Sequence, residues 1–90
     1  MSGVNDNTAR SRYELEEDGL TAYADYRREA GRLYVDYVFS PEPLRGKGTA
    51  DRLMRGVVAA AEADGVRIVP ICGYAATWLQ RHREFDHLIA

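Results

Sequence analysis

The chain has 90 residues, which is enough for one compact domain and no more. Hydrophobic residues make up 46% of it and charged residues 29%, a balance that excludes wholesale disorder. Twelve Lys and Arg residues stand against fourteen Asp and Glu residues, for a net charge of -2. We therefore expect no polycationic face and no nucleic-acid partner.

The cysteine and histidine counts exclude further classes of protein. A single cysteine cannot form an internal disulfide, and with only two histidines beside it we expect no metal site. No apolar run is long enough to cross a membrane, and the polar segment 1–12 lacks the apolar stretch of a signal peptide. These features predict a cytoplasmic protein with no membrane partner.

Alternating apolar and polar residues predict β-strands in the first half of the chain. Residues 1–10 have no such pattern, so we expect a flexible leader there and a single domain over 11–90. The strands are predicted at 12–16, 20–26 and 33–39. Asp18-Gly19 is a strong two-residue hairpin signal between the first two. Three antiparallel strands in a meander are the simplest arrangement.

The hydrophobic period changes in the second half. One face of an amphipathic helix is formed by Ala50, Leu53, Met54, Val57, Val58 and Ala61. Gly65 ends this helix, the short apolar run 66–72 predicts a strand covered on both faces, and 74–82 predicts a second helix. The order is β-β-β-α-β-α. Since a helix joins the last two strands, the fourth is expected to be parallel to the third, which gives an α+β fold with a mixed sheet.

The glycine-rich segment 44–50 lies where the third strand gives way to the long helix. Unpaired backbone N–H groups and the positive end of the helix dipole meet at such a position, which favours a bound phosphate. Gly46 and Gly48 permit a positive φ and remove Cβ atoms that would hold an anion away. Arg45 and Lys47 add two cations beside them.

Two common phosphate-binding loops do not match this segment. A Walker A loop requires Ser or Thr after Gly-Lys and an earlier glycine, but Gly48 follows Lys47 and Pro41 occupies the earlier position. A dinucleotide-binding fingerprint requires a third glycine where Asp51 stands, and a parallel βαβ unit near the start of the fold.

A third pattern does match. Arg45, Gly48 and Ala50 fill the Arg-x-x-Gly-x-Ala positions of the acyl-CoA pyrophosphate loop, so the chain resembles the GNAT acetyltransferase superfamily. From about Tyr13 onward it is similar to the small, single-domain GNAT-like family, which shares the loop matched by Leu44 to Ala50. That family also has a second motif, matched here by Pro70, Cys72, Tyr74, Arg81 and His82.

The resemblance implies a minimal GNAT-like fold and an N-acetyltransferase that moves an acetyl group from acetyl-CoA to an amine by direct transfer. Acetyl-CoA would bind where the third and fourth strands splay apart. The backbone of Val38, Phe39 and Ser40 would pair with the pantetheine arm like an extra strand. The phosphates would contact Arg45, Gly46, Lys47, Gly48, Thr49 and Ala50.

Cys72 and Tyr74 are the candidate catalytic residues. Cys72 is the only thiol, lies at a predicted strand end, and is either a nucleophile that takes the acetyl group or a small buried hydrophobe. His82 is the one adjacent base that could activate it. Tyr74 either protonates the departing CoA thiolate or packs over the fourth strand.

The chain departs from the family at one position, because Tyr37 is the nearest equivalent of a histidine that members often have on the strand before the loop. Asp36 and Glu42 are alternative proton relays. A CoA-binding module without catalysis is therefore the rival hypothesis. The acceptor is a small amine or a protein lysine or N-terminus, and a monomer or weak homodimer is expected.

Overall fold

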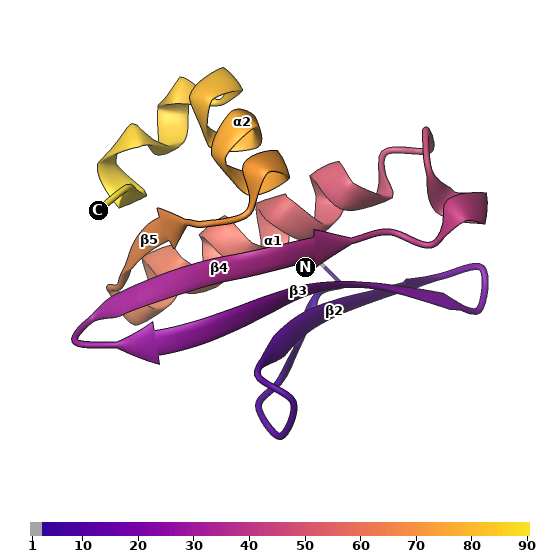
Figure 1. Cartoon of the computed structure of the whole chain (residues 1–90), viewed down its shortest axis with the longest axis horizontal. Coiled ribbons are helices and arrows are strands. Elements are labelled where there is room, and N and C mark those ends of the chain that lie inside the picture. The colour runs from indigo at the N-terminus through magenta and orange to yellow at the C-terminus, as the bar shows by residue number, and fades with distance from the viewer. Residues whose placement is uncertain (1–2) are drawn as a thin grey trace.

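The computed structural model describes residues 3–90 (Figure 1). A five-stranded sheet has the order β1-β2-β3-β4-β5. Its strands are β1 (Asn5–Asn7), β2 (Arg12–Glu17), β3 (Leu20–Glu29), β4 (Arg32–Phe39) and β5 (Arg67–Pro70). The helices are α1 (Thr49–Asp64), α2 (Gly73–Arg81) and two 3-10 segments, Glu42–Leu44 and Arg83–Leu88.

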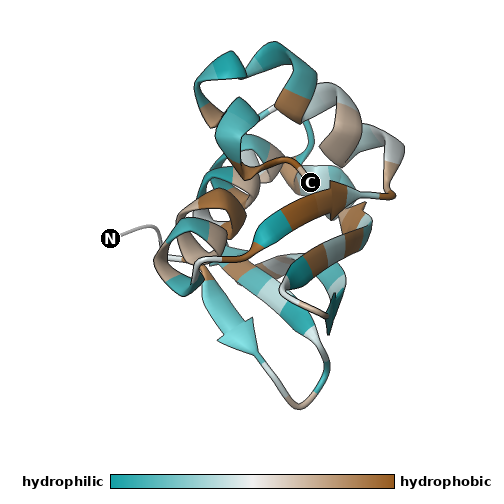
Figure 2. Cartoon of the chain, turned by 90° about the vertical axis from the view of Figure 1, so that its left-hand side faces the viewer, coloured by the Kyte–Doolittle hydropathy of each residue, from teal (hydrophilic) through white to brown (hydrophobic). Residues whose placement is uncertain are grey.

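The predicted meander of β2, β3 and β4 is confirmed, since each neighbouring pair is antiparallel. Asp18 and Gly19 both have a positive φ, 53° and 74°, as a two-residue hairpin turn requires. Figure 2 shows hydrophobic and hydrophilic residues alternating along the strands. The expected mixed sheet is also confirmed, because β4 and β5 run parallel.

The N-terminal strand β1 was not predicted. Asn5–Asn7 pairs with β2, so the expectation of a flexible leader over 1–10 is wrong for these residues, while residues 1–2 lie outside the described part. The sequence has no alternating pattern here, and long-range contacts hold the segment in place instead. The Tyr26 hydroxyl donates to Asp6 (2.7 Å), and Val4 packs against the hydrophobic core at Gly56, where a Cβ atom would clash with it.

Helix α1 covers one face of the sheet with the apolar side that its sequence predicts. Its inward residues Leu53, Met54, Val57 and Ala61 are fully buried. The predicted helix end is confirmed, since Gly65 has φ 67° and its N–H donates back to the last turn.

The expectation that both faces of strand β5 are covered is wrong, and β5 is also the edge strand of the sheet. Ile68 is fully buried, but Arg67 is exposed. The C-terminal segment shields the outer edge, because Ile89 bridges to Ile68 and the Ala90 N–H donates to the Ile68 carbonyl (2.9 Å). An apolar run can thus mark a strand that is covered from the side rather than from above and below.

Candidate functional site

Strand β4 loses its parallel neighbour halfway along its length. Pairing with β5 ends at Val35 opposite Pro70, and the N–H groups of Ile71 and Cys72 then both donate to the Val35 carbonyl (3.0 Å each). The chain turns away into α2, so 36–39 pairs with β3 alone. One edge of this half-strand is therefore open to an extended ligand.

A pocket of about 390 Å³ lies at this opening. All of the residues predicted to bind the cofactor line it, except Lys47. The full lining is Tyr37, Val38, Phe39, Ser40, Leu44, Arg45, Gly46, Gly48, Thr49, Ala50, Asp51 and Tyr74. The fold thus joins the open end of β4, the glycine-rich turn and the start of α2 in one cavity.

The glycine-rich turn leaves the N-terminus of α1 open. Gly46 and Gly48 have φ of 81° and 82°, and no side chain caps the helix. Within residues 3–90, the N–H groups of Thr49, Ala50 and Asp51 have no protein acceptor. These free donors and the helix dipole point at the pocket and suit an anion.

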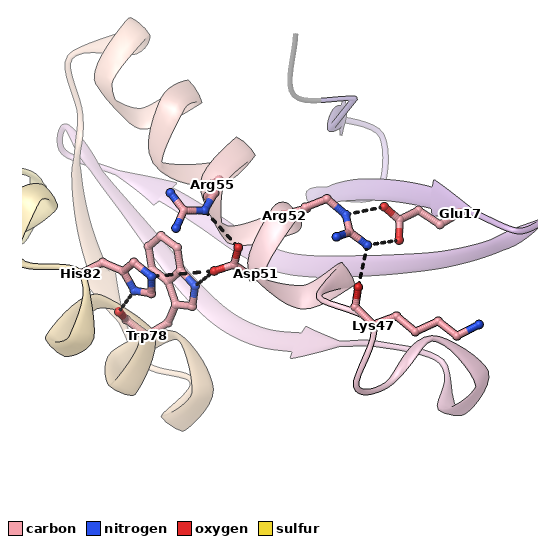
Figure 3. A network of polar contacts seen from close by, with 7 residues as sticks. All are labelled: Glu17, Lys47, Asp51, Arg52, Arg55, Trp78 and His82. Atoms are coloured by element: carbon pink, nitrogen blue, oxygen red, sulfur yellow. Dashed lines mark hydrogen bonds and ion pairs between the residues drawn. The ribbon is translucent and has the colours of Figure 1, made fainter.

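The turn is clamped from the β2–β3 hairpin by Glu17. The buried Thr49 hydroxyl donates to Glu17 (2.6 Å), and Arg52 makes a bidentate pair with the same carboxylate (2.7 and 2.8 Å; Figure 3). Arg52 also donates to the Lys47 carbonyl (3.0 Å). The hydrogen bonds from Arg52 and Thr49 lower the pKa of Glu17 to about 2. Sequence reasoning missed this clamp, because nothing local marks Glu17.

Asp51 connects the start of α1 to α2. Its carboxylate accepts hydrogen bonds from the Trp78 indole N–H (2.8 Å) and from Arg55 (3.0 Å; Figure 3). Although burial opposes ionisation, these bonds lower the pKa of Asp51. Trp78 is buried, as the sequence predicts for a core residue, and the hydrogen bond of its indole nitrogen also holds α2 against the first turn of α1.

The pocket also contains an unsatisfied polar group. Ser40 Oγ is buried and has no hydrogen-bond partner among residues 3–90. The neighbouring backbone is fixed, since Arg45 Nε donates to the Ser40 carbonyl (2.9 Å) while its guanidinium lies over the Phe39 ring. A buried hydroxyl without a partner favours a ligand that supplies one.

The two candidate catalytic residues occupy different environments. Tyr74, on the first turn of α2, is 42% exposed and lines the pocket. Burial and the nearby Asp51 carboxylate raise its pKa, so its hydroxyl keeps its proton. Cys72 is half-buried, packs against the core and does not line the pocket. His82 lies at the other end of α2, where its Nδ1 donates to the Trp78 carbonyl (2.7 Å).

The alternative proton relays and a metal site receive little support. Asp36 forms a bidentate pair with Arg27 (2.8 and 3.0 Å), and Glu42 is exposed and outside the pocket. No group of three or more possible metal ligands occurs within residues 3–90. In that same range no helix is long and apolar enough to span a membrane.

Comparison with known proteins agrees with this geometry. The family model described as GCN5-related N-acetyl-transferase matches residues 12–88, so the chain belongs to this family, and the resemblance inferred from its motifs is confirmed. A GCN5-like protein from Staphylococcus aureus, solved by NMR, has a similar fold, with a TM-score of 0.70 and 18% identity. The match covers 100% of this chain and 91% of that one. No curated protein matches the sequence.

Proposed function

We propose that the protein is an acetyl-CoA-dependent N-acetyltransferase, which moves an acetyl group to an amine. One observation carries the proposal. The pocket joins the open edge of β4 to the uncapped N-terminus of α1, and these are the two features that a CoA thioester needs. Family membership supports the same reaction class.

The residues of the pocket fit acetyl-CoA, which supplies an activated thioester. The pyrophosphate would accept hydrogen bonds from the free N–H groups at 49–51, with Arg45 adding charge. The amide groups of the pantetheine arm would pair with the backbone of 38–40, and the Ser40 hydroxyl would gain the partner that it lacks. Lys47 would act as a distant cation, because it does not line the pocket.

The proposed reaction is a direct transfer within a ternary complex. The amine nitrogen attacks the thioester carbonyl carbon, a C–N bond forms, and the C–S bond breaks. Tyr74 gives its hydroxyl proton to the departing thiolate, the amine loses its proton to water, and water returns a proton to the Tyr74 phenolate. The raised pKa of Tyr74 keeps the proton on its hydroxyl until the thiolate departs. Cys72 would act as a packing residue, since it lies outside the pocket lining.

Calorimetric titration with acetyl-CoA tests the binding site. Micromolar binding is expected for the wild type and no binding for Gly48→Glu, because the new carboxylate would stand at the helix N-terminus beside the phosphates. Gly65→Glu is the matched control. It strains the same left-handed backbone conformation, but at the far end of α1, and is expected to retain binding.

An assay of acceptor-dependent CoA release then tests catalysis. Turnover with any amine supports the transferase. Binding of acetyl-CoA with no turnover over a broad amine panel would instead make the protein a CoA-binding module, and absence of binding would contradict both functions.

A further inference from the structure

Three aromatic rings form a cluster on the sheet face opposite α1. Tyr23 lies between the fully buried Ala22 and Ala24, so its side chain points to the other face. Its ring centroid is 5.2 Å from that of Phe39 and 6.3 Å from that of Tyr37. Figure 1 shows α1 behind β3 and β4, and no helix of residues 3–90 in front of them. No helix of the described part covers the cluster, in which Tyr37 is exposed while Tyr23 and Phe39 are half-buried.

The aromatic cluster is continuous with the pocket. Tyr37 and Phe39 belong to both, and Tyr37 is 50% exposed. If the thioester lies along the open edge of β4, an acceptor that approaches from this face meets these rings. This step rests on the proposed function.

The two carboxylates that flank Tyr37 are already paired with arginines. Asp25, opposite Tyr37 on β3, binds Arg12 (3.1 Å), and Asp36 binds Arg27. Glu14 accepts a hydrogen bond from Asn7 and lies on the other side of Tyr23 from β4. Among the described residues, a polycationic acceptor thus finds both carboxylates next to Tyr37 bound to arginines, and Glu14, bound only by the neutral Asn7 amide, beside Tyr23 instead.

Arginine side chains lie over two of the three rings of the cluster, Tyr23 and Phe39. The Arg12 guanidinium lies 3.8 Å from the centroid of Tyr23, and the Arg45 guanidinium lies 5.9 Å from that of Phe39. Among the described residues, none places a guanidinium over Tyr37. The Tyr37 ring stacks beside Phe39, with centroids 6.5 Å apart, and half of the residue is exposed, so a flat ring can extend the stack by offset or edge-to-face contact.

We propose that the acceptors are small amines that carry an aromatic ring, with the ring stacked on Tyr37 and the amine directed at the thioester. Polyamines and lysine-rich peptides are disfavoured, since the two carboxylates next to Tyr37 already bind arginines. The acetyl group goes to the amine of such an acceptor, with CoA as the leaving group and the protons as described above.

Matched acceptors test the inference in the CoA-release assay. Phenethylamine and 2-cyclohexylethylamine have similar shape and reach, but only the first has a π-face. The wild type is expected to show kcat/KM about fivefold higher for phenethylamine, from the typical strength of aromatic pairing. Spermidine and a lysine peptide are expected to be poorer than both.

Variants of two tyrosines assign the preference to a ring. Tyr37→Leu is expected to bring the ratio of the two kcat/KM values to about one, and Tyr37→Phe to keep it. Tyr34→Leu is the matched control, because Tyr34 is on the same strand but outside the pocket lining, and should also keep the ratio.

Two results would overturn the inference in distinguishable ways. A wild-type ratio near one, or a preference for spermidine or the lysine peptide, removes the acceptor class and leaves the transferase intact. Binding of acetyl-CoA without turnover of any amine contradicts the transferase itself.

Discussion

A glycine in the left-handed conformation flanks each end of α1, but the surroundings of the two ends differ. Gly48 before the helix and Gly65 after it both adopt a left-handed conformation, with φ of 82° and 67°. At the C-terminal end, Gly65 and Val66 donate their N–H groups to the last carbonyls of the helix. At the N-terminal end no side chain caps the helix, so its first donors remain free.

The contacts that hold each end of the helix also differ. Glu17 and Arg52 clamp the turn before α1, and Trp78 binds Asp51 in its first turn. The C-terminal end has two exposed contacts, Arg28 with Asp64 (2.8 Å) and His87 with Glu62 (3.0 Å). The comparison teaches that the closed end of this helix is held by exposed contacts, whereas the end with free N–H donors is held by part-buried hydrogen bonds.

The largest effect on turnover is expected from a change of Tyr74, which lines the pocket together with the N-terminal end of α1. Tyr74→Phe removes the proton donor for the CoA thiolate and should lower kcat about 100-fold, as general-acid groups typically do. Acetyl-CoA binding should change little. Steady-state CoA release and calorimetry measure the two quantities.

Cys72→Ala is the matched control on the same turn, and its kcat should stay within about twofold of the wild type, since packing alone is lost at a half-buried position. If Cys72→Ala is inactive and Tyr74→Phe is not, the acetyl group passes through the thiol.

A smaller effect is expected when the hydrogen bonds of Glu17 to Thr49 and Arg52 are removed. Glu17→Ala leaves the buried Thr49 hydroxyl and Arg52 without their acceptor, so the phosphate-binding turn loosens and acetyl-CoA should bind about tenfold more weakly. Calorimetric titration measures the change. Unaltered affinity would mean that the turn holds its shape without the hairpin.

The same carboxylate gives a pH dependence of stability. The pKa of Glu17 falls from an ordinary 4.5 to about 2 on folding, so the folded state favours the ionised form. Its contribution is complete above pH 4.5 and is lost as the pH falls through 2. The difference in urea stability between wild type and Glu17→Gln should therefore shrink between pH 5 and pH 2, and a constant difference would contradict the clamp.

Ser40→Ala should separate binding from stability. The hydroxyl has no protein partner, so its removal should not destabilise the free protein, but acetyl-CoA should bind about fivefold more weakly for the loss of one hydrogen bond. Thermal unfolding with and without acetyl-CoA measures both. Equal stabilisation of variant and wild type by the ligand would remove Ser40 from the site.

The smallest effect is expected at the closed end. Asp64→Asn breaks a surface ion pair with Arg28 and should cost about 0.5 kcal/mol of stability. Acetyl-CoA binding should be unchanged. Denaturant unfolding and calorimetry check the two values, and weaker binding would show that the two helix ends are coupled.

Local patterns predicted much of this protein. Period-two alternation placed β2, β3 and β4, and the positions from Ala50 to Ala61 placed the buried face of α1. The positive φ values in the loop 44–50 were predicted because they belong to the glycines themselves, while phosphate binding by this loop stays a prediction. Each of these signals lies within a few residues of chain.

Other features had no local signal. Strand β1 consists of Asn and Asp and forms because β2 and Tyr26 bind it. Nothing in the sequence marks the one-residue register shift opposite Asp25, although such a shift decides which side chains of β4 face solvent.

The sequence by itself determined the types of the main elements from β2 to α2, the positive φ of the glycine turn and the family. Only the tertiary structure decided how the turn is held, which candidate residues meet in one pocket, and which ring remains open beside it. The physical reason is distance along the chain. Glu17 and Arg52 are 35 residues apart and Asp51 and Trp78 are 27 apart, so their contacts exist only after the sheet and both helices have packed.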